Sequence, residues 1–323
     1  MKLFKRNGGG ALRLYYASDI HGTEVLWRKF LHAPSVYGAE VLVMGGDVTG
    51  KVVIPLVEDG DALVGELFGR PERAVTPEDR EELQHRIRAN GMYPHVMSRE
   101  EVQRVAALDE EQRETWFAEV MLETFERWLA LADERLAGSD ARCFVMPGND
   151  DPPGVDGAIE RAGRIEACDG RVVGFDGYTM VSLGYSNVTP FNSPRELEED
   201  ELYRRVEALA AEVDDLGRCI FNLHVPPYGS QLDTAPALDE DLRVVATAGQ
   251  PKMIPVGSTA VRELIERFQP LLALHGHVHE SRAATRIGRT LCINPGSDYH
   301  TGRISGVLVH LKDERADYQF VVG

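Results

Sequence analysis

The sequence predicts an α/β (α+β) protein built in layers, and three observations carry this prediction. Short, wholly apolar runs such as 41–44 are typical of strands buried on both faces. Helical patterns alternate with these runs, while the last strand-like runs follow one another directly, which favours mixed sheets. Hydrophobic residues make up 43% of the 323 positions, which is enough to bury a sizeable core.

The main fold is predicted element by element from its apolar patterns. A strand at 12–17 is followed by a helix at about 24–31 and a strand at 41–44. Apolar residues at three- and four-residue spacing predict a long helix from about Phe117 to Leu136, whose aromatic residues we expect to pack in the core rather than to stack on bases. Further strands are predicted at 143–146, 179–183, 219–223, 271–274, 291–293, 306–311 and 318–322, and helices at 195–216 and 259–268.

The segment at about 51–108 has a different pattern, and we interpret the chain as a single domain, 1–323, with an insertion or cap there. Two strand-like runs, 52–57 and 62–68, flank a turn and predict a hairpin. Helix-start signals follow at Thr76 and Ser98. This segment could shape substrate access, pair subunits or decorate the surface, and the sequence leaves these roles open.

Composition excludes several classes of function. A net charge of −17 repels long polyanions and disfavours a DNA-coating or membrane-surface role. No apolar stretch reaches eighteen residues, and residues 1–10 lack the apolar block of a secretory signal, so we expect a cytoplasmic protein. The four cysteines form no CxxC pair, which predicts buried free thiols rather than a thiolate metal site.

Five strand-like runs end in short loops that carry residues able to bind metals. In open α/β sheets, ligands bind beyond the carboxyl ends of the strands, so these loops are expected to converge. Carboxylate, imidazole and amide groups together suit Mn²⁺, Zn²⁺, Fe²⁺ or Ni²⁺. Each motif alone is common by chance, and their shared position is the stronger signal. The loops carry Asp19 and His21; Asp47; Asn149, Asp150 and Asp151; His224; and His275, His277 and His279.

The order of these motifs, DxH, GD, GN, H and GHxH, resembles the calcineurin-like metallophosphoesterase superfamily over residues 12 to about 311, apart from the insertion. The resemblance implies a four-layer α/β/β/α sandwich of two mixed sheets flanked by helices, with two metals at one edge. It also implies a first metal held by Asp19, His21 and His279, a second held by Asn149, His224 and His277, and Asp47 as the bridge. His275 lies outside this ligand set, and the turn 294–297 matches a recurring turn of small prokaryotic members.

The third motif departs from the family pattern, which is often GNH. Asp150 stands at the position of that histidine and is followed by Asp151. An ordinary aspartate is ionised at pH 7 and is a poor acid, and two carboxylates beside the metals would repel a dianionic monoester. This departure favours a phosphodiester substrate, unless one of the two aspartates only orients a neighbouring residue.

The predicted function is therefore hydrolysis of a small phosphodiester by a hydroxide that bridges two divalent metals. Mn²⁺ is the favoured ion, with Fe, Ni²⁺, Zn²⁺ and Mg²⁺ as alternatives. The residues expected to act in catalysis are Asp47, Asn149, Asp150 and His224. The competing hypotheses are a phosphomonoesterase or protein phosphatase, a non-catalytic scaffold and a nuclease for DNA ends. Nucleic acid and membrane partners are disfavoured, and a homo-oligomer is left open.

Overall fold

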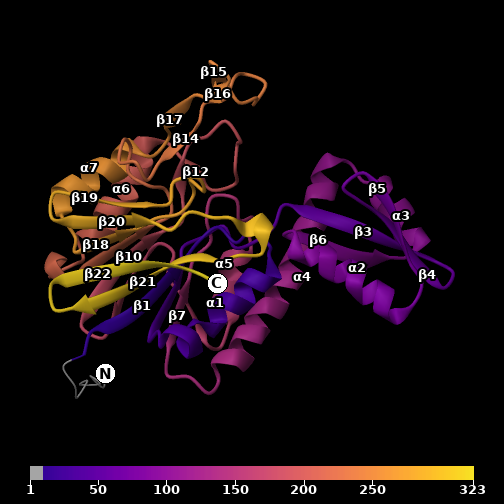
Figure 1. Cartoon of the computed structure of the whole chain (residues 1–323), viewed down its shortest axis with the longest axis horizontal. Coiled ribbons are helices and arrows are strands. Elements are labelled where there is room, and N and C mark those ends of the chain that lie inside the picture. The colour runs from indigo at the N-terminus through magenta and orange to yellow at the C-terminus, as the bar shows by residue number, and fades with distance from the viewer. Residues whose placement is uncertain (1–9) are drawn as a thin grey trace.

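The computed structural model describes residues 10–323 and contains two six-stranded mixed sheets that pack face to face (Figure 1). The predicted lack of a secretory signal rests largely on residues 1–9, which lie outside the described residues. None of the helices in residues 10–323 is long and apolar enough to cross a lipid bilayer. All four cysteines are buried and free, as predicted.

The first sheet places the N-terminal strand at its centre. Strand β1 pairs in parallel with β2, which pairs in parallel with β7 and then β8, while β21 and β22 continue the sheet in antiparallel fashion. The parallel strands therefore end at the same edge of the sheet. The strands, in spatial order, are β22 (Arg315–Val322), β21 (Ser305–Lys312), β1 (Leu12–Ala17), β2 (Val41–Met44), β7 (Arg142–Val145) and β8 (Ile165–Ala167).

The second sheet also contains four parallel strands, but here one antiparallel strand lies at each edge. Its order is β19 (Ala283–Ile287), β20 (Thr290–Asn294), β18 (Leu272–Leu274), β13 (Cys219–Leu223), β10 (Tyr178–Leu183) and β9 (Arg171–Phe175). Strands β8, β9 and β19 were not predicted. Strand β8 has only three residues, β9 and β19 are only partly buried, and none of the three contains a continuous apolar run.

The core is layered because side chains alternate along each strand. In β1, Leu14 and Tyr16 face the second sheet, whereas Tyr15 and Ala17 face the outer helices. The outer layer on the first sheet is α1 (Glu24–Tyr37), α4 (Glu110–Leu136) and α5 (Val155–Arg161), and on the second sheet it is α6 (Glu199–Ala210) and α7 (Thr259–Phe268). The predicted four-layer sandwich is confirmed.

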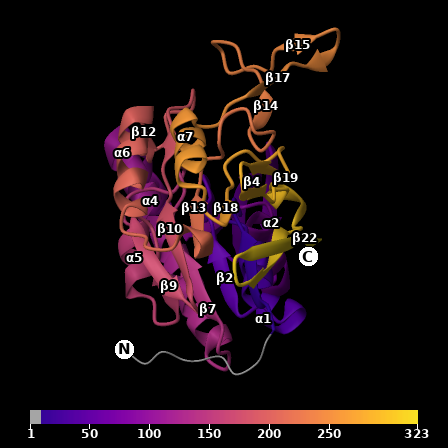
Figure 2. The ribbon, with the colours of Figure 1, turned by 90° about the vertical axis from the view of Figure 1, so that its left-hand side faces the viewer.

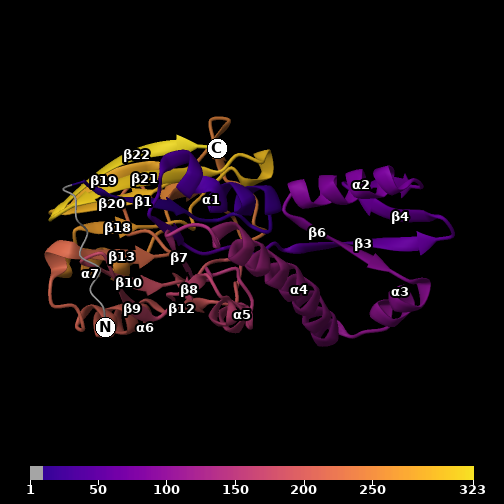
Figure 3. The same ribbon diagram turned by 90° about the horizontal axis from the view of Figure 1, so that it is seen from below.

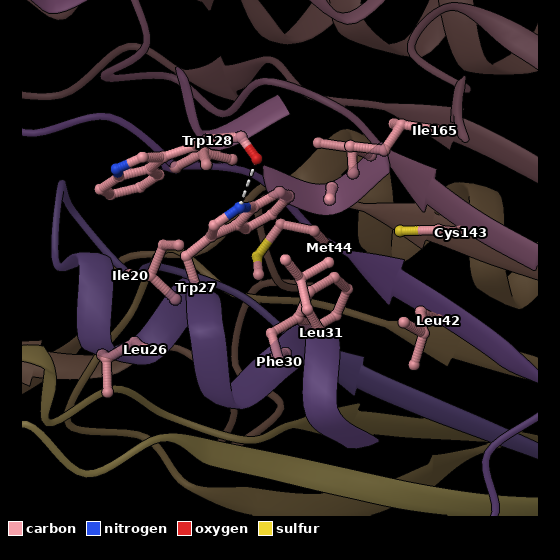
Figure 4. Close-up of a cluster of buried hydrophobic side chains, with 14 of the residues drawn as sticks. Ile20, Leu26, Trp27, Phe30, Leu31, Leu42, Met44, Trp128, Cys143 and Ile165 are labelled. Atoms are coloured by element: carbon pink, nitrogen blue, oxygen red, sulfur yellow. Dashed lines mark hydrogen bonds between the residues drawn. The ribbon is translucent and has the colours of Figure 1, made fainter. Parts of the chain in front are cut away.

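Helices α1 and α4 are joined by two tryptophans in the outer core (Figure 4). The Trp27 indole donates a hydrogen bond of 2.9 Å to the Trp128 carbonyl oxygen, and the two rings stack with centroids 6.1 Å apart. Phe125 and Trp128 are buried as predicted, while Trp116 and Phe117, nearer the start of α4, are only half-buried. The Trp116 ring instead contacts the His95 ring edge-on at 5.5 Å.

Residues 52–106, here called the inserted segment, form a separate four-stranded sheet with two helices beyond the end of α4 (Figure 3). The predicted hairpin and both helix starts are present, but strands β5 and β6 were not foreseen. Prolines and charged residues in these two strands mask the apolar alternation. The elements are β3 (Val52–Asp59), β4 (Ala62–Leu67), β5 (Arg70–Ala74), α2 (Pro77–Ala89), β6 (Met92–Met97) and α3 (Arg99–Ala106).

The predicted helix at 195–216 is wrong at both ends, since α6 covers only Glu199–Ala210. The first residues of the predicted helix instead form a short strand, where the Glu196 carboxylate accepts hydrogen bonds from the backbone amides of Thr189 and Ser193.

A projecting arm of short strands between β13 and α7 was also not predicted (Figure 2). The remaining elements are β11 (Ser186–Asn187), β12 (Glu196–Leu197), η1 (Leu216–Arg218), β14 (Thr234–Pro236), β15 (Ala246–Thr247), β16 (Gln250–Pro251), β17 (Met253–Pro255) and η2 (Tyr299–Thr301).

Candidate metal centre

The five predicted loops meet beyond the carboxyl ends of the parallel strands. The Asp19 amide donates to the Gly46 carbonyl oxygen at 3.0 Å, which ties the loop after β1 to the loop after β2. The Gly276 amide donates to the His224 carbonyl oxygen at 2.9 Å, which ties the loops of the second sheet. Side chains more than 250 positions apart are thereby brought into one site.

The candidate ligands form two groups, and within each group the donor atoms lie within 4.8 Å of one another. The Asn149 amide oxygen completes the second group, 2.9 Å from His224 Nε2 and 2.7 Å from His277 Nδ1. All seven predicted residues are therefore in one place. The first group is Asp19, His21 and His279, and the second is Asp47, His224 and His277.

Asp47 lies between the two groups. One of its oxygens, Oδ2, is 3.7 Å from His21 Nε2 and 3.4 Å from His224 Nε2, although these histidines belong to different groups. A single carboxylate with this placement can reach two cations at once, which is the geometry of a dinuclear site.

The donor atoms of the first group are close enough together to bind one cation. The Nε2 atoms of His21 and His279 are 3.0 Å apart, and Asp19 Oδ1 lies 3.5 Å from the same atom of His279. Two imidazoles and a carboxylate form a donor set that suits borderline divalent metals. The residues present therefore fit the implied ions.

Several candidate ligands have a backbone conformation that residues with a side chain rarely adopt. Asp19, His21, Asp47 and His277 have φ values of 57°, 38°, 50° and 65°. Each such residue costs on the order of 1–3 kcal/mol, and such strain concentrates at functional sites. Its repetition at four of the seven candidate residues indicates a site rather than ordinary turns.

Glycines beside the ligands are required by close packing. A Cβ on Gly148 would lie 2.2 Å from Asp47 Oδ1, and one on Gly276 would lie 2.3 Å from Asp19 Oδ2. Both distances are far below van der Waals contact. The glycine before Asn149 and the glycine before His277 thus give the two carboxylates room to approach the neighbouring loops.

The two histidines nearest the second sheet are oriented by backbone carbonyls. Since a carbonyl oxygen can only accept, His224 Nδ1 donates to Gly45 at 2.8 Å and presents Nε2 to the site. His275 Nδ1 donates to the Leu223 carbonyl oxygen at 2.8 Å, and the ring is fully buried beside the strand end. The structure therefore places His275 as a support for the His224 loop, in agreement with its position outside the expected ligand set.

Burial keeps two of the four candidate imidazole ligands, those of His21 and His277, neutral. Burial, and then the charge of His279, lowers the pKa of His21 to about 4. Burial, and then His224, lowers the pKa of His277 to about 3. Neutral imidazole is the form that binds metal, so both rings are ready to act as ligands at neutral pH.

The carboxylates have the opposite effect on His224. Burial lowers the pKa of its ring, but the charge of Asp47 outweighs burial and raises that pKa to about 10. Burial would raise the pKa of Asp19, yet its hydrogen bond to His279 and the nearby imidazoles lower it well below the usual range. The buried carboxylates therefore attract positive charge into the site.

No family model matches this chain. An uncharacterised protein of Methanocaldococcus jannaschii is 34% identical over 129 residues, which cover 39% of this chain and 52% of that protein. The chain thus spans about half the length of the curated relative that it matches.

Solved structures identify the fold. One crystal structure matches with a TM-score of 0.56 at 17% identity and covers 96% of this chain and 98% of the other. The crystal structure of TT1561 of Thermus thermophilus matches with a TM-score of 0.51 at 14% identity and the same coverage. The chain therefore shares the layered α/β fold of these two proteins. The α/β sandwich that the five-motif resemblance implied is thereby confirmed.

The two aspartates after Asn149 have different roles in the structure. Asp151 is fully buried and accepts hydrogen bonds from the backbone amides of Val48, Thr49 and Gly148. It therefore braces the loop that carries Asp47. Of the alternatives that the sequence left open, the structure favours for Asp151 the one in which an aspartate only orients a neighbouring residue, because amide donors hold this carboxylate inside the protein.

Asp150 remains at the site, and its surroundings include residues that sequence reasoning missed. Its donor oxygen lies within 4.8 Å of a ring nitrogen of His21 and a carboxylate oxygen of Asp47. Its carboxylate accepts from Ser193 Oγ at 2.6 Å and forms an ion pair with Lys51. Burial would raise the pKa of Asp150, but Lys51 outweighs burial and lowers it. No local motif could have revealed Lys51 or Ser193, because neither belongs to the loop of Asp150.

The turn 294–297 supports the site from behind. The Asn294 side-chain amide donates to the Gly276 and Val278 carbonyl oxygens at 3.1 and 2.9 Å, and the Ser297 hydroxyl donates to the Asp19 carbonyl oxygen at 2.6 Å. These bonds connect the loops of the first group. Just after this turn the half-buried Tyr299, which was not predicted, places its ring 4.8 Å from that of His21.

Proposed function

We propose that this chain is a metal-dependent phosphoester hydrolase that acts on a small phosphodiester. The observation that carries the proposal is the position of Asp47 between two groups of Asp, His and Asn donors on a metallophosphoesterase fold. We further propose one domain over 1–323, with the insertion at about 51–108 as a cap beside the site.

The chain's own residues would have distinct tasks. Asp19, His21 and His279 would hold one cation, Asn149, His224 and His277 the other, and Asp47 would contact both. When bound, two divalent ions, with Mn²⁺ favoured, would supply Lewis-acid charge and an activated water for attack on phosphorus.

The preference for a diester rests on the state of Asp150. Its carboxylate accepts hydrogen bonds from Asn149 Nδ2 and Ser193 Oγ and pairs with Lys51, so it is arranged as an acceptor and not as a proton donor. Phosphoryl transfer from a monoester places much charge on the leaving oxygen, which makes a proton donor valuable. A carboxylate in place of a proton-donating side chain at this position suits a diester better.

A phosphomonoesterase or protein phosphatase is the second candidate, because the ammonium of Lys51 adds positive charge that a dianionic monoester would favour. A panel of one aryl diester and the monoester with the same leaving group, assayed with Mn²⁺, Ni²⁺ and Mg²⁺, distinguishes the two. A higher kcat/KM for the monoester would replace the diester proposal.

The test of the whole proposal is Asp47→Asn. Asparagine tolerates the positive φ of this position and keeps an oxygen for the Asp150 amide, which donates to Asp47 Oδ1 at 2.9 Å. We expect kcat/KM to fall at least about 100-fold, since loss of an outer partner of a metal ligand alone costs about 10–100-fold. Metal content, measured by elemental analysis, should fall by at least one ion.

The matched control is Asp140→Asn, which makes the same change at an exposed aspartate outside the site. It should retain full activity and metal content. Full activity and full metal content in Asp47→Asn would refute the proposed site.

A further inference from the structure

We propose that Lys51 is a substrate-binding residue whose ammonium contacts a phosphoryl oxygen, and that Asp150 is the positioning residue that holds this ammonium at the mouth of the site. The proposal rests on the proposed function and names a residue, and a selectivity for charge, that the metal-ligand set does not include.

The first support is location. Lys51 pairs with Asp150, and the donor oxygen of Asp150 is within 4.8 Å of donor atoms of His21 and Asp47. The Lys51 ammonium therefore lies next to a carboxylate that itself borders the residues that would hold the cations. A phosphoryl group that lies over those residues comes within reach of the same ammonium.

The second support is the contrast in exposure across the ion pair. The Asp150 side chain is 12% exposed and is fixed by Ser193 Oγ at 2.6 Å and by Asn149 Nδ2 at 3.0 Å. The Lys51 side chain is 58% exposed. An ammonium has three N–H donors, so a lysine held on one side by a buried carboxylate can offer its other donors to a ligand from solvent.

The third support is the anchoring of the backbone next to Lys51. The Gly50 amide donates to the buried Tyr93 hydroxyl at 2.6 Å. A Cβ on Gly50 would lie 2.4 Å from the Gly91 carbonyl oxygen and 3.2 Å from the Gly22 Cα, so the chain here is packed against the loop of His21. The inserted segment begins at the next residue after Lys51, which gives it a direct role in placing this cation.

The physical reason for such a residue is the charge of the protein. The chain carries a net charge of −17, and the site contains the carboxylates of Asp19, Asp47 and Asp150. A lysine at the entrance offsets the charge of Asp150 and attracts an anionic ester. Because the attraction scales with ligand charge, it should favour a dianionic monoester over a monoanionic diester.

The experiment compares Lys51→Ala, Lys51→Arg and the control Lys252→Ala, an exposed lysine on the projecting arm. Steady-state kinetics with Mn²⁺ would use an aryl diester and the monoester with the same leaving group. We expect Lys51→Ala to raise KM for the monoester about tenfold, the lower end of the value of a charge-assisted hydrogen bond. KM for the diester should rise less, kcat should change less than KM, and Lys51→Arg should recover part of the loss.

A second measurement does not depend on turnover. Calorimetric titration of the Mn²⁺-loaded proteins with inorganic phosphate should show about tenfold weaker binding for Lys51→Ala and no change for Lys252→Ala. Mn²⁺ stoichiometry should be equal in all variants, which would exclude a general loss of the site.

A double variant distinguishes direct contact between Lys51 and phosphate from simple neutralisation of the Asp150 charge by Lys51. If Lys51 only cancels the charge of Asp150, then Lys51→Ala combined with Asp150→Asn should bind phosphate as tightly as the wild type, and that result would overturn the proposal. If Lys51 contacts phosphate, binding stays weak in the double variant. A wild type that hydrolyses neither ester would defeat the proposed function alone, while equal phosphate binding by wild type and Lys51→Ala would defeat this inference.

Discussion

The sandwich has a large hydrophobic core, whereas the inserted segment has a small one. The sandwich buries three clusters, one between its sheets and one under each outer helix layer, and the loops of the candidate metal centre extend from strands covered on both faces. The inserted segment has one cluster of six buried residues beneath α2. The strained site loops therefore belong to the part of the molecule with the larger core. The inserted segment, beyond the N-terminal end of α4 (Figure 1), depends on one small hydrophobic cluster.

The strongest test of this comparison removes one buried isoleucine from each region. Ile220→Ala in the sandwich and Ile87→Ala in the inserted segment both truncate fully buried side chains, and each should cost about 2–5 kcal/mol. We expect Ile220→Ala to lower the midpoint of global unfolding by denaturant. Ile87→Ala should instead raise hydrogen exchange in residues 52–106 and leave the sandwich protected.

Equal loss of protection in both regions of Ile87→Ala would show that the two regions unfold as one cooperative unit and would break the comparison. The conservative variant Ile87→Val, expected to cost about 0.5–1.5 kcal/mol, provides the control for the size of the side chain.

A smaller effect is expected where the inserted segment meets the site. Gly91 and Gly60 both have positive φ, 71° and 60°, so alanine at either position costs about 1–2 kcal/mol from the backbone alone. A Cβ on Gly91 would also lie 2.5 Å from the His21 carbonyl oxygen, whereas nothing lies within 4 Å of one on Gly60. Gly91→Ala should therefore cost about 1–3 kcal/mol more and weaken Mn²⁺ binding.

Thermal unfolding and Mn²⁺ titration of the two glycine variants measure these effects. Gly60→Ala should bind Mn²⁺ as the wild type does. If Gly91→Ala also binds Mn²⁺ normally, the inserted segment does not support the His21 loop, and the two regions are more independent than the packing indicates.

The smallest effect concerns the start of α2. The Thr76 hydroxyl accepts from the Asp79 amide at 3.1 Å, and the Asp79 carboxylate accepts from the Thr76 amide at the same distance. Thr76→Ala should cost about 1 kcal/mol, and its effect should appear only in the exchange of the inserted segment. Thr76→Ser keeps the hydroxyl and should match the wild type. A change of exchange in the sandwich would contradict this expectation.

Prediction from sequence was accurate where a local pattern was strong. Strands at 12–17, 41–44 and 219–223 and the helix at 259–268 have the predicted bounds, since buried parallel strands and an amphipathic helix leave clear apolar patterns. Strands β5 and β6 were missed because prolines and charged residues interrupt the pattern. The start of α6 was misplaced because acidic residues suit both a helix N-terminus and a loop.

The sequence by itself determined the fold class and the seven candidate ligands, because strand-end loops with these residue types have few other uses. The resemblance already implied Asp47 as the bridge, and the structure places it between the two groups. Only the tertiary structure decided that Asp151 is buried behind the ligand loops and that Lys51 reaches Asp150. The physical reason is that these relations join loops far apart in the chain. Their relative positions depend on the packing of two sheets and an inserted segment, which no local pattern encodes.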